Sequence, residues 1–416
     1  MLSFARQMIA MLLFVVALAT PAAADGLFAP LGDQQTAEAA GLVAPFLAAR
    51  RWRDVALDPA YLAAAIAPEG MDQRRDRLNR VPRPTAVRIE LFAGLVVDLE
   101  RTSITEAFGG GFVWTGESSG PVDATANLVI RNGRISGHVS ILSGQPMNYR
   151  IDSLGLGRIH RISELDSSAF PPEGHPLTGG QNHGLQVPDA VVPSDLPAAD
   201  ELTTIDVLIA YTDAAAAQVQ DIVAQANLAI SLSNSGFSRS NVQIQFRLVG
   251  TQRVSNYTET GYLTMLNDLT SGSLAQFQQV HASRDRTEAD LVGMLVASRE
   301  NCGQGWMPTP TAATAIYGFS LTTVSCITTY TFAHELGHNM GLNHDRYVVT
   351  PQPPATQYNF GFVSVPGGFE TIMSYRDECR AAGASCIRIN NFSNPALNYG
   401  GRPTGIPAGS PGAADA

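Results

Sequence analysis

The stretch Phe332–Asp345 reads FAHELGHNMGLNHD and predicts a helix that carries part of a metal site. His334 and His338 are four residues apart, so on a helix they lie on one face, about one turn from each other. Gly341 comes three residues after His338, where a glycine can adopt the left-handed backbone that ends a helix. The chain can then turn back, and we expect it to bring His344 to the same point as a third ligand.

The spacing of these histidines favours a metal site over simpler interpretations. A single histidine on a helix is more often a packed or surface residue than a ligand, and a bare HExxH pattern also arises by chance. Here, however, three of the eight histidines of the chain fall in the order HExxHxxGxxH. Three neutral imidazoles with an open fourth position are typical of one catalytic Zn²⁺, because a structural site would close all four positions. Iron or manganese is the alternative, but histidine-only ligation favours zinc.

Glu335 lies beside the expected ligands, where its carboxylate can reach a water on the metal without binding the metal itself. Zinc lowers the pKa of its bound water toward about 7, so that hydroxide is available at neutral pH. Glu335 is then expected to be the general base that takes the proton of this water and later delivers it to a leaving amine. This chemistry is the hydrolysis of a peptide bond, and the expected substrates are proteins or peptides.

The composition limits the function only weakly. The chain has 416 residues, which suggests two or three domains with ample room for a core. Hydrophobic residues make up 45% and charged residues 15%, as in ordinary globular proteins. The net charge is −10, and all 27 basic residues are arginine, with no basic block among them. Nucleic acid is therefore not an expected partner.

Residues 1–24 have the pattern of a signal peptide. Arg6 gives the start a positive charge, Ile9–Leu18 is a short apolar core, and the alanines at 22–24 form an A-x-A cleavage site. A membrane anchor is the alternative, but the apolar run is too short to cross a bilayer comfortably, and no other long apolar segment appears in the sequence. We expect no membrane span and a mature chain that begins near Asp25 and is secreted, to the medium or to the periplasm.

Export makes the four cysteines informative, because an even set in an oxidising compartment is expected to form disulfides. They are Cys302, Cys326, Cys379 and Cys386, and three pairings are open. We favour Cys302–Cys326 with Cys379–Cys386, since these pairs close the two sequential loops. Free thiols are the alternative, and they fit an exported chain poorly.

Residues 25–200 are expected to form a separate front part, the leader. Helices are expected at Ala39–Ala48 and Pro59–Ala67, and alternating apolar residues further on predict a β-rich module with a tight hairpin at Asn132-Gly133. Phe170–Asp200 is rich in Pro, Gly and Asp and has no periodicity. It is therefore interpreted as an exposed linker that proteases can cut.

Residues 201–402 have the pattern of an α/β (α+β) domain. The expected strands are Thr203–Tyr211, Val242–Leu248 and Asp290–Ala297, and the expected helices are Ala214–Leu232 and Leu263–Arg284. This alternation predicts a mixed, mostly parallel sheet with helices packed on it. A further strand is expected at Ala315–Thr322, at the edge of the sheet beside the cleft. Residues 403–416 show no pattern and are interpreted as a flexible tail.

The zinc-binding helix is expected to pack on this sheet. It spans roughly Thr329 to Met340. Within it, Phe332, Leu336 and Met340 form an apolar face that turns toward the sheet and away from the histidines.

The zinc motif and the later run IMSY at 372–375 together resemble the signature of the metzincin metalloproteases. The resemblance implies that Met373 lies in a tight turn as a hydrophobic floor under the zinc, although a methionine alone would be interpreted as core packing. Tyr375 matches a tyrosine that approaches the zinc in astacin-like and serralysin-like members. It could contact the metal, stabilise the oxyanion or simply pack. Asp345 matches a position that supports the site without binding the metal.

Several flanking segments also resemble the bacterial peptidyl-Asp metalloendopeptidases. These segments are IDVLIAYT, ANLAISLSNSG, QFRLVG, the region Cys302–Cys326 and NFSNP, and together they cover most of residues 203–405. The resemblance implies cleavage on the amino side of aspartate, which needs a cation in the pocket for the residue after the cut bond. Arg376, Arg380 and Arg388 lie after the methionine turn, and an arginine fork can hold a carboxylate with two hydrogen bonds. The choice among them stays open, and all three could instead be surface charges.

A removable leader in front of a secreted protease resembles a zymogen, with the propeptide as an intramolecular inhibitor. No cysteine lies between residues 25 and 300, so a thiolate of the leader cannot block the zinc. Asp189, Asp195 and His183 are candidates for this blocking role, and the bonds before Asp189, Asp195 and Asp200 are candidates for self-cutting. Two alternatives stay open: a metzincin of broad specificity, and a secreted binding protein without activity on the same scaffold.

Overall fold

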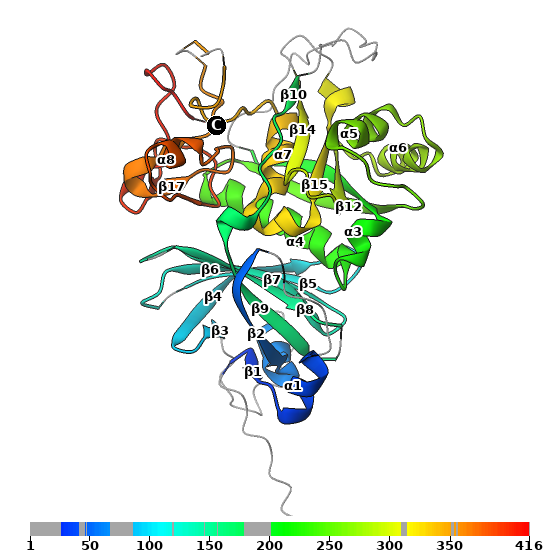
Figure 1. Cartoon of the computed structure of the whole chain (residues 1–416), viewed down its shortest axis with the longest axis vertical. Coiled ribbons are helices and arrows are strands. Elements are labelled where there is room, and N and C mark those ends of the chain that lie inside the picture. Colours follow the sequence, from blue (N-terminus) through cyan, green and yellow to red (C-terminus); the bar gives the residue numbers. More distant parts are fainter. Residues whose placement is uncertain are drawn as a thin grey trace, which may run out of the picture.

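The computed structural model describes residues 26–40, 46, 48–66, 86–118, 120–144, 146–155, 157–178, 201–308, 314–350, 353–354 and 357–415. The chain folds into two halves that lie one above the other (Figure 1). The lower half is the sheet of the leader, and the upper half is the α/β domain. The expected signal peptide and residues 179–200 of the expected linker lie outside the described residues.

In its described part, the leader is built on a nine-stranded antiparallel sheet with the order β1-β2-β9-β8-β7-β6-β5-β4-β3. Its strands are β1 (Phe28–Pro30), β2 (Ala49–Leu57), β3 (Ala86–Phe92), β4 (Leu95–Glu106), β5 (Phe112–Ser118), β6 (Ala124–Arg131), β7 (Arg134–Ile141), β8 (Met147–Ser153) and β9 (Ile159–Leu165). From β3 to β9 each strand pairs with the next one along the chain. Asn132 and Gly133 have φ of 51° and 69°, as a two-residue hairpin turn requires. The hairpin is therefore where the sequence predicts it.

Two short helices, α1 (Asp33–Ala40) and α2 (Pro59–Ile66), accompany this sheet in the described part of the leader. The helix α2 is at its expected place, but the bounds of the helix expected at Ala39–Ala48 are wrong among the described residues, because residues 46 and 48 lie outside any helix; residues 41–45 and 47 are not among those described. The helix α1 begins earlier and ends at Ala40, and β2 begins at Ala49. Alanine has the highest helix propensity, but propensity is a weak guide that tertiary contacts override, so composition alone places the bounds of a helix poorly.

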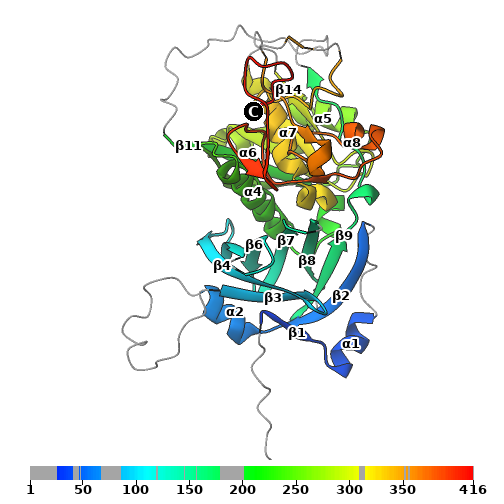
Figure 2. The same ribbon diagram turned by 90° about the vertical axis from the view of Figure 1, so that its left-hand side faces the viewer.

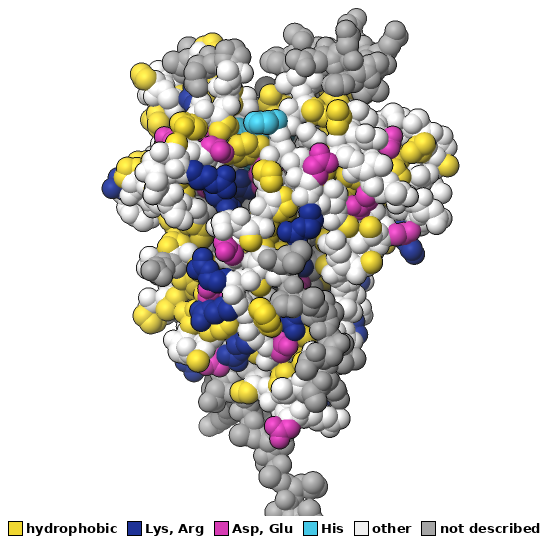
Figure 3. All heavy atoms as spheres, in the orientation of Figure 1, with side chains coloured by type: hydrophobic (Ala, Val, Ile, Leu, Met, Phe, Trp, Pro, Cys, Tyr) yellow, Lys and Arg dark blue, Asp and Glu magenta, His cyan; other side chains and the backbone are white. Residues whose placement is uncertain are grey.

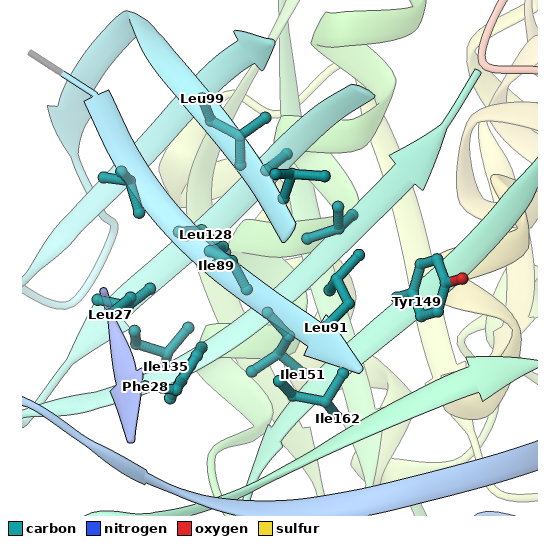
Figure 4. Packing of buried hydrophobic residues seen from close by; sticks show 14 of the residues in the cluster. Leu27, Phe28, Ile89, Leu91, Leu99, Leu128, Ile135, Tyr149, Ile151 and Ile162 are labelled. Carbon is teal, nitrogen blue, oxygen red and sulfur yellow. The ribbon is translucent and has the colours of Figure 1, made fainter. Parts of the chain in front are cut away.

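The core of the leader lies inside its curved sheet. Buried apolar side chains from β3, β6, β8 and β9 meet there, among them Ile89, Leu128, Ile151 and Ile162 (Figure 4). Each of these four side chains is at most 2% exposed. A contiguous apolar cluster of this kind is typical of a separate domain.

The upper half contains a six-stranded sheet with the order β10-β14-β15-β13-β11-β12 among the described residues. Its strands are β10 (Leu177–Thr178), β11 (Thr203–Thr212), β12 (Ile244–Val254), β13 (Leu291–Val296), β14 (Gly303–Met307) and β15 (Phe319–Thr323). The pairs β11–β12, β11–β13 and β13–β15 are parallel, whereas β14 pairs antiparallel with β15. The mixed, mostly parallel sheet that the sequence predicts is confirmed.

Both long helices that the sequence predicts before the zinc motif are divided into two. The structure has α3 (Asp213–Ala217), α4 (Ile222–Arg239), α5 (Tyr262–Ser271) and α6 (Ala275–Thr287). Asp221 begins α4 by accepting a hydrogen bond of 2.9 Å from Ala224 N, and Gly272 ends α5 with φ of 60°. Cap residues, rather than apolar spacing, place these helix ends. Among the described residues, no helix is long and apolar enough to span a membrane.

The edge of the sheet beside the cleft differs from the prediction. The sequence predicts an edge strand at Ala315–Thr322, but β15 has a neighbour on each side, β13 and β14. The sequence does not predict the strand β14, because its sequence GQGWM contains two glycines, which weaken a strand pattern. On its outer side β14 pairs in parallel with β10 of the leader, where Leu177 is opposite Trp306.

The helix α7 (Thr331–Asn339) carries the zinc motif and packs on this sheet. The Phe332 ring fills the place of a side chain at Gly293 on β13, where an added Cβ would lie 2.5 Å from the ring. Leu336 is fully buried, and Met340 packs at the border of the same core. The apolar face of the helix therefore turns to the sheet, as predicted.

The chain after α7 forms small elements around the end of this helix. They are β16 (Val363–Ser364), β17 (Phe369–Glu370), α8 (Asp377–Ala381), β18 (Ile387–Arg388), β19 (Asn398–Tyr399) and β20 (Arg402–Pro403). The strands β16, β17 and β18 form a small sheet of their own. Cys302 is bonded to Cys326, and Cys379 to Cys386, which is the pairing that the sequence favours.

The last described residues correct a prediction. The sequence predicts a flexible tail at 403–416, but Thr404, Ala413 and Ala414 are buried. Arg346 Nε donates to Ala413 O at 2.9 Å. An added Cβ at Gly405 would lie 2.4 Å from the carbonyl oxygen of residue 414, so the backbones approach closely. Small side chains allow this contact, and they leave no apolar pattern in the sequence.

The helix α4 joins the two halves. It packs on β12 of the upper half and on β6 of the leader (Figure 1, Figure 2). Asn127 on β6 donates to Ser231 Oγ and to Ser235 Oγ, each at 2.8 Å. Arg131 pairs with Asp221 at 3.0 Å. The leader is thus held against the upper half by a partly polar contact.

Gly293→Ala tests how closely α7 lies on the sheet. The new methyl group would meet the Phe332 ring 2.5 Å away in a packed core, so we expect the free energy of unfolding to fall by about 1–3 kcal/mol. Urea unfolding followed by circular dichroism measures this change. Gly120→Ala is the control, since an added Cβ there would meet only Ser118 Oγ, at 3.6 Å. A Gly293→Ala protein as stable as the parent would contradict this packing.

Candidate metal centre

Three histidine side chains meet at the C-terminal end of α7. His334 and His338 come from the helix, Gly341 turns the chain with φ of 93°, and His344 follows on the loop. The Nε2 atoms lie 3.1 Å apart for His334–His344 and for His334–His338, and 3.0 Å apart for His338–His344. All three side chains are buried, and among the described residues they form the one cluster that could hold a metal ion.

The outer nitrogens of two of these rings show which nitrogen carries the proton. His334 Nδ1 lies 2.7 Å from Ile372 O, and His338 Nδ1 lies 2.8 Å from Leu342 O. A carbonyl oxygen only accepts, so each Nδ1 donates and each Nε2 keeps a free lone pair. Burial lowers the pKa of His338 to about 4, and it lowers the pKa of His334 and of His344 well below the usual value. The three rings are therefore neutral.

Neutral rings whose nitrogens face one another at 3.0 and 3.1 Å need a cation between them. In a tetrahedral zinc site the nitrogens lie about 2.0 to 2.1 Å from the metal, and therefore about 3.3 Å from one another. The observed spacing is close to this value, and imidazoles are ligands that suit zinc. The residues therefore fit a zinc ion with one coordination position left open.

Glu335 lies next to this cluster, and no other described residue forms a hydrogen bond with its carboxylate. Both carboxylate oxygens are buried without a hydrogen-bond partner among the described residues. The side chain rests against β14, where an added Cβ at Gly303 would lie 2.4 Å from Glu335 Oε1. Burial, and next the charge of Glu173, raise the pKa of Glu335 well above its usual range. A buried carboxylate without a partner reduces stability, and such groups are typical of functional sites.

The turn at Ile372 and Met373 packs directly against α7. Ile372 supplies the carbonyl that accepts from His334, and Met373 is fully buried. An added Cβ at Gly337 would lie 2.7 Å from Met373 Sδ, so the sulfur occupies the space that this glycine leaves. Met373 is thus in contact with the helix between the two histidines that it carries.

Asp345 and Tyr375 connect the histidine loop to this turn. Asp345 Oδ2 accepts a hydrogen bond from Tyr375 N at 2.8 Å, and its other oxygen accepts from a second backbone N–H at 3.1 Å. The carboxylate of Asp345 therefore supports the loop and is not part of the metal cluster. The Tyr375 ring lies 4.0 Å from the His344 ring, centroid to centroid. The Tyr375 hydroxyl donates to two leader carbonyls, Glu173 O at 3.2 Å and Gly174 O at 3.0 Å.

A cavity of about 720 Å³ lies beside the histidines, and all three candidate arginines line it. Arg388 is buried, Arg376 is partly buried and Arg380 is exposed. Arginine side chains gather on this face of the molecule next to α8 (Figure 3). The structure therefore brings the three candidates to one cavity, at different depths.

The leader reaches this cavity with residues that the sequence interpretation assigns to an exposed linker. Residues 170–173 and His175 line the cavity. The His175 ring lies 5.7 Å from the His344 ring, centroid to centroid, but His175 is not part of the metal cluster. The first residues of the expected linker therefore pack in the site, which corrects that interpretation.

Glu173 and His175 were not among the leader candidates, because the stretch PPEGHP has no periodicity. Its prolines could have signalled an extended backbone, which is able to lie along a sheet edge. The candidates from the sequence, Asp189, Asp195 and His183, lie outside the described residues.

Comparisons with known proteins agree with this geometry. The model of the reprolysin-like metallopeptidases of family M12B matches residues 202–403. The peptidyl-Asp metalloendopeptidase of Stenotrophomonas maltophilia strain R551-3 is 31% identical over 341 residues, which cover 75% of this chain and 76% of that protein. The enzyme of the same name from strain K279a is 31% identical over 336 residues, with 75% and 76% covered. The one from Xanthomonas campestris is 27% identical over 325 residues, with 75% of each chain covered.

Zinc binding tests the histidine cluster directly. We expect the full-length chain to bind one zinc ion, and we expect His344→Ala to weaken that binding at least about 100-fold, because it removes one of three ligands. Equilibrium dialysis with metal analysis measures the affinity without an assay of activity. His281→Ala is the control, since His281 lies on α6 and its Nε2 contacts Leu269 O at 2.8 Å. Equal zinc affinity in His344→Ala and the parent would contradict this ligand set.

Proposed function

Because the chain belongs to the family of bacterial peptidyl-Asp metalloendopeptidases, it is a zinc metalloendopeptidase, and we propose that it is secreted as a zymogen and cuts on the amino side of aspartate. One observation carries the proposal: three buried, neutral imidazole nitrogens face one another beside a buried carboxylate that no other described residue holds. This arrangement suits metal-assisted hydrolysis of proteins or peptides. The names of the relatives state a preference for aspartate, and we propose the same preference for this chain.

The proposed roles divide the chemistry among a few side chains. His334, His338 and His344 hold the zinc ion. Zinc, when bound, supplies a Lewis acid that polarises a carbonyl and allows water to attack at neutral pH. Glu335 is the general base, whose carboxylate takes a proton from the attacking water and later delivers it to the nitrogen of the leaving amine. The lack of a partner for both Glu335 oxygens among the described residues supports this role, since nothing there competes for them.

Tyr375 is proposed to stabilise the negative charge that develops on the carbonyl oxygen of the cut bond. Its hydroxyl already donates to two peptide carbonyls of the leader, at 3.2 and 3.0 Å. A hydroxyl in this position can serve a substrate carbonyl once the leader has left. Met373 is proposed to act only by positioning, since it packs against α7 and is fully buried.

The outer edge of β14 is proposed to receive the substrate as an added strand. The leader occupies this edge through β10, and Gly174 N donates to Gly303 O at 2.9 Å. When the leader leaves, the same backbone groups become free to pair with an extended peptide. Glu335 rests against this strand, so a peptide bound there passes the proposed general base.

Features of the N-terminal part of the chain support the proposals that the protein is secreted and that the leader keeps it inactive. The signal-like residues 1–24 and the two disulfides suit an oxidising compartment. The leader has an apolar core of its own and also reaches into the cleft, which suits an intramolecular inhibitor. A cut before Asp189, Asp195 or Asp200 would separate the leader from the rest of the upper half, from residue 201 on, which we call the catalytic half.

A mixed peptide pool separates the proposed activity from its alternatives. We expect the processed protein to cut before aspartate at least about tenfold more often than before other residues, and we expect a zinc chelator to abolish the cutting. Mass spectrometry of the fragments, with and without the chelator, gives both results. Indiscriminate cutting would favour a protease of broad specificity, and no cutting would favour a binding protein on the same scaffold.

Glu335→Gln keeps the shape of the side chain but removes the base. We expect kcat/KM to fall by about 10²–10⁴-fold while zinc affinity stays within about twofold, and we expect the purified chain to remain uncut. Peptide assays, metal analysis and gel electrophoresis measure these three properties. Glu100→Gln, at an exposed position on β4 away from the proposed cuts, is the control and should behave as the parent. A Glu335→Gln protein that matures normally when purified alone would contradict self-cutting.

A further inference from the structure

The leader crosses the cleft with its backbone held on both sides of Glu173. Cys302 N donates to Pro172 O at 2.7 Å, and Gly174 N donates to Gly303 O at 2.9 Å. Further along the chain, β10 pairs with β14. Glu173 is therefore held at one place along the edge strand, and its side chain is directed by the backbone on either side.

The Glu173 carboxylate binds the catalytic half through Arg388. Glu173 Oε1 accepts a hydrogen bond from Arg388 Nη1 and another from Thr331 Oγ1, the latter at 2.9 Å. The side chains of Arg388 and Glu173 are only 8% and 6% exposed, so this ion pair is shielded from water. A charge-assisted hydrogen bond is stronger in such surroundings than at the surface. Among the described leader residues that line the cavity, Glu173 is the only acid.

Arg388 is held in place by the catalytic half itself. Its Nη2 donates to Ser374 O at 2.7 Å, and its Nε lies 3.6 Å from Glu370 Oε1. Its Nη1 has one further contact, with Thr329 O at 3.4 Å, besides the carboxylate of Glu173. Removal of the leader would therefore leave this fixed N–H group at the cavity without its carboxylate partner, so that another acceptor could take the place of Glu173.

The two other candidate arginines make different contacts. Arg376 Nη1 donates to Ser167 O of the leader, and its Nε lies 3.5 Å from Glu370 Oε1 of the catalytic half. The leader group that Arg376 contacts is therefore a backbone carbonyl and not a carboxylate. Arg380 is exposed on α8, where an ion pair would be weakened by water. In the described part of the chain, Arg388 is therefore the candidate that binds a carboxylate of the leader.

The direction of the leader across the site is also informative. From Glu173 in the arginine pocket, the chain passes the Tyr375 hydroxyl and reaches His175, whose ring lies 5.7 Å from the His344 ring. A substrate that is cut before its acidic residue must run the other way, from the metal cluster to the pocket. The leader thus crosses the site in the direction opposite to that of a substrate. The peptide bond before Glu173 therefore does not lie at the metal cluster.

We propose that Arg388 binds the acidic side chain that follows the cut bond, and that Glu173 occupies the same place in the uncut chain while the leader crosses the site in reverse. The proposal rests on the proposed function of the chain as an aspartate-directed protease. One guanidinium then has two successive partners, first the leader and then the substrate. No covalent bond forms or breaks in this exchange of ion pairs, and departure of the leader opens the pocket.

Hydrogen exchange on the full-length chain tests the leader contact without an assay of activity. All variants carry Glu335→Gln, so that the leader stays attached. We expect Glu173→Gln and Arg388→Gln each to speed the exchange of the amides in residues 172–178 and 302–307 by at least about tenfold. We expect the double variant to add less than about twofold, because both substitutions remove the same contact.

Arg380→Gln is the matched control, because Arg380 lines the same cavity from the surface and should leave the exchange unchanged. Glu173→Gln alters only the leader, so it decides the question even if Arg388→Gln does not fold. Unchanged exchange in Glu173→Gln, or additive effects in the double variant, would overturn the proposal.

Peptide cutting tests the second partner of Arg388. The full-length chain with Glu173→Gln and an intact Glu335 is given two peptides that differ only by Asp or Asn after the cut bond. We expect kcat/KM to be at least about tenfold higher for the Asp peptide. Adding Arg388→Gln should reduce this ratio to less than about threefold, and adding Arg380→Gln should leave it unchanged. The ratio does not depend on the fraction of protein that is folded and open.

The outcomes separate this inference from the proposed function. If neither the processed parent nor any variant cuts a peptide, the proposed protease activity fails. If the preference for Asp is present and survives Arg388→Gln, the protease activity stands and the assignment of Arg388 is wrong.

Discussion

The site depends on one constraint: three uncharged imidazole nitrogens are held 3.0 to 3.1 Å apart in the protein interior, with their lone pairs facing one another. This arrangement is unfavourable without a cation, so the surrounding structure has to maintain it. The carbonyls of Ile372 and Leu342 hold two of the rings, and the packing of Phe332 on Gly293 holds their helix. Asp345 ties the loop of the third ring to the following turn. Sheet, helix, loop and turn are thus arranged around one point.

The parts of this site that are close in sequence could be predicted, and the parts that depend on distant contacts could not. His334, His338 and His344 follow from the period of a helix and from one glycine turn. The edge strand β14 was missed because glycines replace the apolar side chains that mark a strand. Glu173 and Arg388 are 215 residues apart, so no local pattern connects them. Sequence reasoning placed Arg388 among three candidates, and only the fold distinguishes the three by depth and partner.

Arg388 lies between two carboxylates, Glu370 of the catalytic half and Glu173 of the leader. Burial raises the pKa of Glu370 to about 7, although the charges of Arg388 and Arg376 act in the opposite direction. Near neutral pH such a carboxyl carries only part of its negative charge. Glu370 can therefore orient the guanidinium of Arg388 without fully neutralising its positive charge. The pocket then stays positive, as the proposed binding of an acidic side chain requires.

The leader and the catalytic half belong to one chain, and this has a consequence for the activation that we propose. A tethered segment is present near its binding place at an effective concentration in about the millimolar range. Modest contacts, such as a two-residue strand pairing and one ion pair, are then enough to keep the cleft filled. After the proposed cut and release of the leader, the same segment would be present only at the concentration of the released protein. Dilution, rather than any change in the contacts themselves, would then make the proposed activation a one-way step.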